Sequence, residues 1–273
     1  RLIEELVQYD KLKTEFIANM SHELKTPLNI IFSTAQLFSV YINEDVNSNN
    51  NEKLNEYTRY IKQNCYRLLR LVNNIIDISK IDSKFMELNL KNQNIVQVVE
   101  EITMSIIPYA KGMSRTIIFD TNIEEKIMAF DEEKIERILL NLISNATKFT
   151  RPGDTIEVCV QDKDNHVIIS VKDNGIGIPE DKLSQIFERF KQVDPLLSRA
   201  HEGSGIGLTI VKSLVEMHGG NINVKSKYQE GTEFTISLPV RMVDHNDINN
   251  SKIGLINQTN SEKIEIEFSD IYK

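Results

Sequence analysis

The sequence predicts an all-α helical hairpin followed by an α+β sandwich. Up to Ile81, apolar residues recur at steps of three and four, which is the spacing of amphipathic helices. From Met86 onward, short alternating segments are mixed with helical ones, without the regular strand–helix–strand order that a parallel sheet needs. We therefore place a helical domain at residues 1–82, a mixed domain at 83–240 and a polar tail at 241–273.

Composition excludes several classes of protein. The chain has 273 residues, of which 40% are hydrophobic and 26% charged, as in ordinary globular domains. The net charge of -8 argues against general nucleic-acid binding. No apolar run approaches the roughly 18 residues of a membrane span, and Cys65 and Cys159 stand alone, so we expect a cytoplasmic fragment without disulfides. Because Arg1 is not an initiator, we expect any membrane segment to lie upstream.

The first helical pattern runs to about Tyr41 and carries a histidine on its exposed side. Its apolar stripe consists of Ile17, Met20, Leu24, Leu28, Ile31, Ala35 and Phe38. At about 100° per residue, His22 lies opposite the stripe, with Thr26 on the same exposed face and Glu23 on the flank. Pro27 removes a backbone hydrogen bond, so we expect a local bend beside His22. Another molecule can reach such an imidazole, although an isolated surface histidine is most often simply solvated.

A polar, Asn-rich stretch at 43–52 predicts a loop, after which a second helix begins. The apolar stripe of this helix consists of Leu54, Tyr57, Ile61, Cys65, Leu68, Val72 and Ile75. Each stripe is wider than one partner helix can bury. We therefore expect two hairpins to pair as a homodimeric four-helix bundle.

The mixed domain is expected to place helices on one face of a mostly antiparallel sheet. The expected strands are at 86–90, 116–119, 155–160, 167–171, 221–226 and 232–238. The expected helices are at 94–109, 131–148 and 205–217. Asn94 and Asp131 are suited to cap the first two helices, and Gly219 and Gly220 end the third.

The tail is polar and Asn-rich from Asp244 to Asn260, which is typical of a linker. Beyond it, Ile264, Ile266 and Phe268 alternate with glutamates. This pattern permits one short edge strand, and a disordered end explains it equally well.

A polar stripe runs along the expected helix at 131–148. Asn141, Asn145 and Lys148 fall at positions i, i+4 and i+7, whereas the other face of the helix is apolar. Amide oxygens suit a hard cation such as Mg²⁺, and a lysine suits phosphate. A solvated helix face explains the stripe equally well.

Two glycine-containing stretches follow. Asp173 ends a strand and precedes Gly175 and Gly177, so its carboxylate can accept a hydrogen bond from an amine such as that of adenine, while the glycines let backbone approach a flat base. A tight turn is the alternative. The second stretch opens a helix, where amide donors and the helix dipole favour phosphates, and its glycines are Gly203, Gly205 and Gly207. The intervening residues 187–202 have the length and polarity of a mobile lid.

In this order, and after the Ser21–Pro27 segment, these stretches resemble the histidine protein kinases of two-component signalling. The matching segments are the family's H box at 21–27, N box at 141–149, G1 box at 173–177, F box at 187–190 and G2 box at 203–207. The resemblance covers about residues 10–240. It implies a dimerisation and phosphoacceptor hairpin followed by a Bergerat-type ATP-binding domain.

The resemblance also implies roles for individual residues. His22 would be phosphorylated, Glu23 would help to activate it, and Thr26 would serve a phosphatase activity. Asn145 would coordinate Mg²⁺, and Arg199 would contact the γ-phosphate. The other ATP contacts would come from Asn141, Lys148, Phe149, Asp173, Gly175, Gly177, Gly203, Gly205 and Gly207. The chain departs from the family where Phe149 replaces the commoner tyrosine and where Ala200–Glu202 replace a run of glycines.

We therefore expect an ATP- and Mg²⁺-dependent kinase that phosphorylates His22 and passes the phosphoryl group to an aspartate of a response regulator. Two alternatives stay open. An ATPase of the gyrase or chaperone type needs no phosphoacceptor, so His22 argues against it. A non-catalytic signalling scaffold has no need of Asn145 or Asp173, so these residues argue against that alternative.

Overall fold

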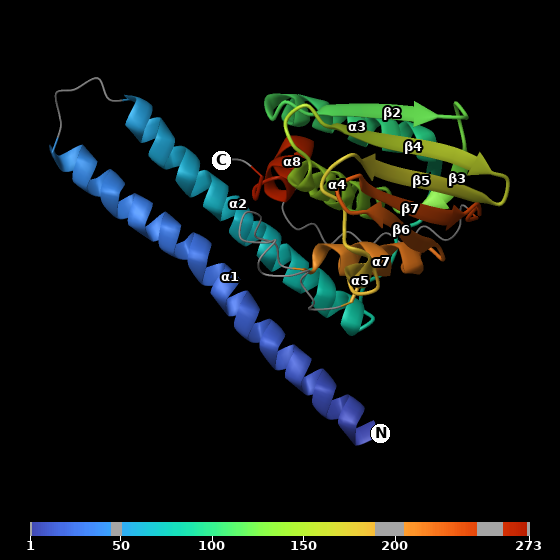
Figure 1. The fold of residues 1–273 in the computed structure, drawn as a ribbon, viewed down its shortest axis with the longest axis horizontal. Helices are drawn as coiled ribbons and strands as arrows, with labels where there is room; N and C mark the ends of the chain where they lie inside the picture. Colours follow the sequence, from blue (N-terminus) through green and yellow to red (C-terminus); the bar gives the residue numbers. More distant parts are fainter. Residues whose placement is uncertain (1, 45–50, 189–204, 245–258, 272–273) are drawn as a thin grey trace.

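The computed structural model describes residues 2–44, 51–188, 205–244 and 259–271. A hairpin of two long helices stands beside an α/β domain, and a short C-terminal helix lies where the two meet (Figure 1). Helix α2 lies between α1 and the α/β domain (Figure 1). None of the described helices is both long and apolar enough to cross a membrane.

The hairpin consists of α1, Leu2–Glu44, and α2, Asn51–Asp82. The two helices extend into both ends of the polar stretch at 43–52, where a loop was expected. Residues 45–50 lie outside the described part of the chain. The bend expected at Pro27 is not seen, because α1 continues through this residue without a break and is nearly straight (Figure 1). Pro27 is buried, so packing holds this turn in line despite the missing hydrogen bond.

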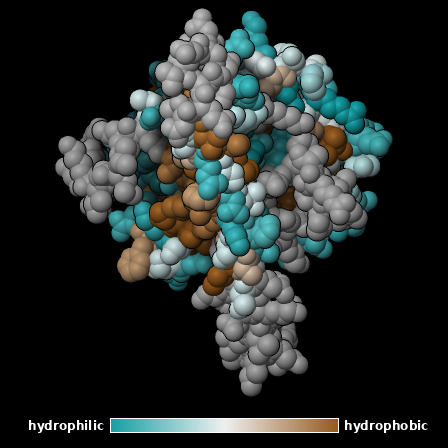
Figure 2. Space-filling model, turned by 90° about the vertical axis from the view of Figure 1, so that its left-hand side faces the viewer, coloured by the Kyte–Doolittle hydropathy of each residue, from teal (hydrophilic) through white to brown (hydrophobic). Residues whose placement is uncertain are grey.

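Only part of the predicted apolar stripe of α1 is covered. Met20, Pro27 and Thr34 are buried on one side of the helix, and Leu24 and Ile31 are half-buried beside them. Other apolar side chains of the hairpin stay exposed, namely Ile17, Leu28, Ile30, Phe32, Leu37, Val40, Leu69, Val72 and Ile76. Figure 2, which views the molecule from this side, shows apolar residues exposed along the middle of the face. The hairpin therefore has more apolar surface than its two helices bury against each other.

The segment after α2 differs from the prediction. Residues 86–90 form no strand, although Met86, Leu88 and Leu90 are more buried than their neighbours and so account for the alternating pattern. A strand begins only at β1, Lys91–Asn94, which pairs antiparallel with β3, Ile127–Phe130. The pattern did not predict this pair because the β1 sequence contains no apolar residue.

The main sheet has the order β2-β4-β5-β7-β6. Its strands are β2, Thr116–Thr121; β4, Thr155–Lys163; β5, His166–Asp173; β6, Asn221–Lys227; and β7, Gly231–Pro239. Only β2 and β4 pair in parallel, so the expected, mostly antiparallel sheet is confirmed. The alternate residues Ile156, Val158 and Val160 are fully buried, which shows that one face of β4 points into the core.

Three long helices cover this face (Figure 1). They are α3, Ile95–Gly112; α4, Glu132–Phe149; and α7, Gly207–Met217; a single turn, α5, Glu180–Leu183, precedes α7. The two predicted caps are confirmed, because the Asn94 side chain accepts from the Val96 amide and Asp131 accepts from the Lys134 amide. The helices are amphipathic, and their apolar sides form the core with the sheet.

The expected edge strand of the tail is instead a helix, α8, Asn260–Glu267. Thr259 and Glu262 form a capping box at its start, and this local interaction favours a helix over a strand. Ile264 and Phe268 are buried in the core, and the Phe268 ring lies 6.5 Å from that of Tyr109. Ile264, Ile266 and Glu267 are all buried, so α8 is covered on more than one side, and its glutamates at 265 and 267 are held in ion pairs.

Candidate nucleotide and phosphoacceptor sites

The polar stripe of α4 is covered rather than solvated. Asn141 is only 3% exposed, Lys148 is also buried, and Asn145 is half-buried. The start of α7 packs directly on this stripe, since a Cβ atom on Gly207 would lie 2.5 Å from Nδ2 of Asn141. A solvated helix face is therefore the wrong explanation for these residues.

Side-chain amides form a chain along the stripe. Asn145 Nδ2 donates to Asn141 Oδ1 over 3.2 Å, and Asn141 Nδ2 donates to Oε1 of Glu267 over 3.1 Å. The Lys148 ammonium lies 5.7 Å from the centre of the Phe149 ring, close enough for a cation–π contact. Two amides and one ammonium thus lie on one side of α4. Their N–H groups are suited to phosphate, and the amide oxygens are suited to a hard cation.

Asp173 lies at the end of β5 and is buried. Its Oδ1 accepts from the Gly175 amide over 2.9 Å. Burial raises the pKa of this carboxyl group, whereas the backbone donors of Gly175 and Thr232 act to lower it. A carboxyl in this position can accept a hydrogen bond from a base amine.

The loop after Asp173 is held close to α4 and to the β6–β7 turn. The Ile176 amide donates to the Phe149 carbonyl over 3.1 Å. Gly175 and Gly177 leave no room for a side chain, because a Cβ atom would lie 2.4 Å from the Phe149 carbonyl oxygen in the first case and 2.1 Å from the Lys227 carbonyl oxygen in the second. Gly177 also has a φ of +65°, a backbone conformation that favours glycine.

The structure thus brings together the stripe of α4, the loop after β5 and the start of α7. The predicted residues that meet there are Asn141, Asn145, Lys148, Phe149, Asp173, Gly175, Gly177, Gly205 and Gly207. Arg199 and Gly203 lie outside the described residues. No group of three His, Cys, Asp or Glu side chains that could hold a metal exists in the described part of the chain. Of the two asparagines, Asn145 is the less buried, and Oδ1 of Asn141 already accepts from Asn145.

His22 is exposed on α1, as predicted, and stands apart from this site. It points about 140° away from the buried side of α1 that carries Met20, Pro27 and Thr34. Thr26 donates its hydroxyl to the His22 carbonyl oxygen over 3.3 Å, so its own oxygen can still accept a hydrogen bond. Glu23 is half-buried and lies near enough to Arg70 of α2 to raise the pKa of that arginine.

Three charged residues that the sequence did not single out lie beside the nucleotide site. Glu267 of α8 is 1% exposed and makes ion pairs with Arg70 of α2 and Arg137 of α4. In the sequence, these arginines look like ordinary members of solvated helix faces. The signal that could have drawn attention to Glu267 was the apolar alternation of the tail. This alternation indicates that the segment packs against something, but it does not identify the partner.

Two family comparisons match most of the chain. Residues 12–84 match the His Kinase A (phospho-acceptor) domain, and residues 130–242 match the histidine kinase-, DNA gyrase B-, and HSP90-like ATPase. The two matches contain His22 and Asn145 respectively, in the domain order found in the structure. The chain belongs to the sensor histidine kinase family.

Relatives of this histidine kinase include the sensor protein SrrB of Staphylococcus aureus, with 32% identity over 231 residues. The aligned part is 84% of this chain and 38% of SrrB, so the kinase chain spans well under half of that relative. Full-length ShkA, solved in complex with AMPPNP, is 28% identical with a TM-score of 0.62, over 84% of this chain and 46% of ShkA. The histidine kinase ThkA, solved in complex with the response regulator protein TrrA, is 23% identical with a TM-score of 0.61, over 88% and 66%, and shows the likeness in fold.

We expect Gly177→Ala to reshape the loop after β5 of the kinase. Left-handed backbone costs alanine about 1–2 kcal/mol, and the contact with the Lys227 carbonyl adds to this cost. Gly153→Ala is the matched control, since Gly153 has a φ of +94° but no atom within 4 Å of its Cβ position. Urea unfolding should show a larger loss of stability for Gly177→Ala, and a fluorescent ATP analogue should bind at least about tenfold more weakly to it alone. Equal effects of the two substitutions would contradict this.

Proposed function

We propose that this chain uses ATP to phosphorylate its own His22 and then passes the phosphoryl group to an aspartate of a response regulator. The observation that carries the proposal is the pairing of two sites. An exposed histidine beside Glu23 lies on the helical hairpin, and the converging residues of α4, the β5 loop and α7 lie in the other domain. Neither site alone would suffice for this reaction.

The nucleotide would bind across the convergence of α4, the loop after β5 and the start of α7. Asp173 would accept from the adenine amine, with Phe149 beside the base. Asn141 and Lys148 would lie near the phosphates, and Asn145 would hold Mg²⁺, which offsets phosphate charge when it is bound. Binding of AMPPNP by ShkA supports an adenine nucleotide as the ligand.

In the proposed reaction, an imidazole nitrogen of His22 forms a bond to the γ-phosphorus of ATP. The bond from that phosphorus to the β–γ bridging oxygen breaks, and ADP leaves with both electrons of the bond. The proton of the other ring nitrogen would be accepted by Glu23, which increases the basicity of the ring. In the transfer to the regulator, an aspartate oxygen attacks the phosphorus and the phosphorus–nitrogen bond breaks. The proton held by Glu23 returns to the ring, so that neutral imidazole leaves.

This reaction requires a change in domain position. His22 points away from α2, and α2 lies between α1 and the nucleotide site (Figure 1). The connection after α2 is suited to act as a hinge, because Lys84 has a φ of 56° and Phe85 is exposed. We therefore assign this arrangement to a resting form of the kinase.

We expect ATP and Mg²⁺ to place an acid-labile, base-stable phosphoryl group on His22. His22→Gln should abolish labelling by radioactive ATP, whereas His166→Gln, at another exposed histidine, should retain it. Asn145→Ala should also abolish labelling and remove Mg²⁺-dependent ATP binding. Undiminished label on His22→Gln would contradict the assignment, and release of free phosphate without labelled protein would favour the ATPase alternative. Neither label nor hydrolysis would favour a scaffold.

The hairpin is also proposed to form a homodimer with a second copy of the chain. Exposed apolar side chains on both helices need a partner, and Phe32, at 62% exposure, is prominent among them. The match to the His Kinase A domain supports this pairing.

Light scattering should therefore give a mass of twice 31.4 kDa for the wild type. Phe32→Glu should shift the mass toward that of the monomer, because it would bury a charge in the interface. Phe85→Glu changes a still more exposed phenylalanine, at 81%, outside the hairpin and should leave the dimer intact. A monomeric wild type at micromolar concentration would show that the apolar face has another use.

A second proposed activity removes phosphate from the regulator and depends on Thr26. The Thr26 hydroxyl lies one turn beyond His22 and can accept from a water aligned with the aspartyl phosphate. Thr26→Ala should retain His22 labelling but slow dephosphorylation of the regulator by about tenfold. Thr58→Ala is the control, because Thr58 makes the same backbone contact on α2, to Leu54. Equal dephosphorylation rates in both variants would leave Thr26 a purely structural role.

A further inference from the structure

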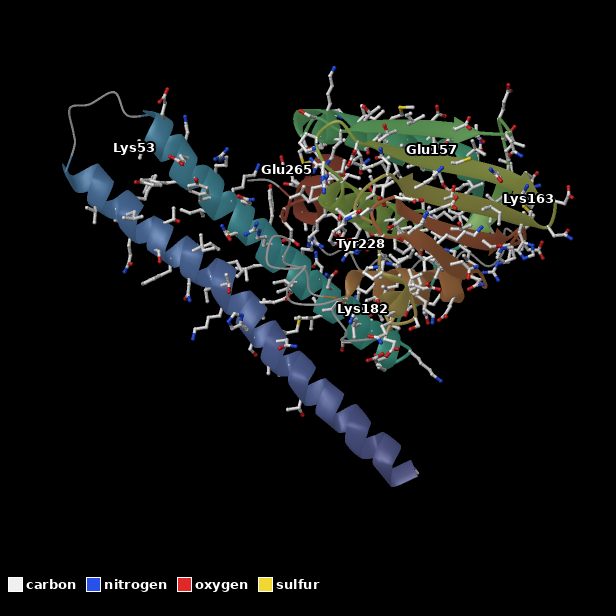
Figure 3. All side chains as sticks on the ribbon, in the orientation of Figure 1. Lys53, Glu157, Lys163, Lys182, Tyr228 and Glu265 are labelled. Carbon is white, nitrogen blue, oxygen red and sulfur yellow. The ribbon has the colours of Figure 1, made fainter. Side chains whose placement is uncertain are left out.

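The C-terminal helix α8 joins the hairpin to the nucleotide domain. On the hairpin side, Lys62 pairs with Glu265 over 2.9 Å, and the Ser269 carbonyl accepts from Gln63 and Arg67. Figure 3 shows Glu265 on α8, on the side toward α2. On the domain side, Lys263 pairs with Glu136 of α4 over 2.5 Å. The helix therefore touches both parts whose relative movement the proposed reaction requires.

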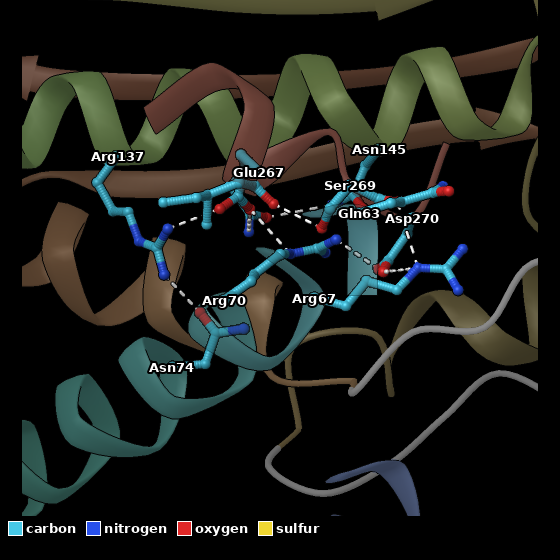
Figure 4. Close-up of polar contacts among 11 residues, drawn as sticks. Gln63, Arg67, Arg70, Asn74, Arg137, Asn145, Glu267, Ser269 and Asp270 are labelled. Atoms are coloured by element: carbon cyan, nitrogen blue, oxygen red, sulfur yellow. Dashed lines mark hydrogen bonds and ion pairs between the residues drawn. The ribbon is translucent and has the colours of Figure 1, made fainter. Parts of the chain in front are cut away.

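Glu267 is the centre of these contacts (Figure 4). Its Oε2 accepts from Arg137 over 2.6 Å, its Oε1 lies 3.5 Å from Nε of Arg70, and the same Oε1 accepts from Asn141 over 3.1 Å. Arg137 continues to α2 through a hydrogen bond to Asn74. The Glu267 carboxylate thus connects α2 with α4 and bonds to Asn141, a residue proposed to contact the nucleotide.

Asp270 extends the network along α2. It pairs with Arg70 and lies 3.6 Å from Nε of Arg67 (Figure 4). Burial acts to lower the pKa of Arg70, but nearby carboxylates outweigh burial and raise the pKa overall. These carboxylates belong to Glu267, Asp270 and Glu23. The carboxylates that raise the pKa of Arg70 therefore come both from the tail and from Glu23, the acid next to His22.

We propose that α8 is an autoinhibitory latch that holds the nucleotide domain against α2 and keeps Asn141 occupied by the carboxylate of Glu267. This inference rests on the proposed kinase function. While the latch is closed, the domain cannot move around the hairpin to His22, since α8 bonds to both. Release of α8 frees the amide of Asn141 and leaves the domain tied to α2 by fewer contacts, among them those of Arg137 with Asn74 and Asp77.

The closed form competes with the nucleotide for the amide of Asn141. The Glu267 carboxylate accepts from this amide, one hydrogen bond from Asn141 and two from Asn145, beside the place proposed for the phosphates. Arg70 and Arg137 offset the charge of Glu267, so the competition is for this donor more than through charge repulsion. The latch and the nucleotide therefore compete, and each weakens the binding of the other by the same factor.

The contacts also make release cooperative. Glu267 and Arg70 make their ion pairs with each other and with Arg137 and Asp270 only while α8 is docked, whereas Arg137 keeps a second carboxylate, Asp77 of α2. An unpaired buried charge such as Arg70 is costly, so partial opening is disfavoured. A helix of two turns has little stability in isolation, so α8 loses its structure once its partners are lost. The device therefore has two states rather than a continuum.

Asp270→Asn in the full 273-residue chain tests the latch. It removes the ion pair with Arg70 but leaves Glu267 in place, so the fold is retained. Asp162→Asn is the matched control, because Asp162 pairs with Lys126 at similar exposure, 23% against 20%, far from both α8 and the nucleotide site. Hydrogen exchange over residues 259–271, His22 labelling and binding of a fluorescent ATP analogue are measured on all three chains.

We expect Asp270→Asn to speed exchange in 259–271 and to raise the labelling rate by about fivefold or more, as loss of one charge-assisted hydrogen bond would. Asp162→Asn should match the wild type. Unchanged exchange, or faster exchange with unchanged or slower labelling, would overturn the latch. If no chain labels His22, the proposed function fails and analogue binding decides: tighter binding to Asp270→Asn still supports a tail that blocks the nucleotide site, and equal binding overturns it.

Discussion

The arrangement of this molecule depends on one buried carboxylate, that of Glu267. It lies between Arg70 and Arg137, which come from different domains, and is almost fully shielded from solvent. A buried ion pair contributes little net stability compared with a well-packed apolar contact, but removing one partner is strongly destabilising. Such a contact fixes a specific arrangement of its elements more than it strengthens the fold, which agrees with the proposed opening of this junction.

The nucleotide domain obtains its site from the way its sheet is connected. Asp173 ends a central strand, and the loop that follows is tied to the end of α4 by the bond from the Ile176 amide to the Phe149 carbonyl. Gly207 then lets α7 begin against Asn141. Three segments far apart in the sequence, α4, the loop after β5 and the start of α7, thus meet at close range. The backbone there packs against other backbone or against the Asn141 amide, so a Cβ atom would collide and glycine is needed at each contact.

The hairpin has surfaces with different tasks. One side of α2 carries Gln63, Arg67, Arg70 and Asn74, all bonded to the tail or to α4. The exposed apolar side chains Leu69, Val72 and Ile76 lie elsewhere on the same helix. A face held by ions and amides can separate into water at moderate cost, whereas an apolar face cannot. The polar composition of the domain-facing side therefore agrees with a movable contact, and the apolar composition of the other with a permanent one.

The sequence by itself determined most of the elements and the family. Periodicity gave both long helices and most strands, caps such as Asn94 and Asp131 marked helix starts, and the order of the polar stretches indicated the histidine kinase family. These features are local, so neighbouring residues suffice to specify them. Only the tertiary structure decided that α1 passes straight through Pro27, that Asn141 is buried, and that Glu267 of the tail lies between two arginines. Each of these outcomes depends on partners distant in the chain, whose charges and surfaces no local pattern records.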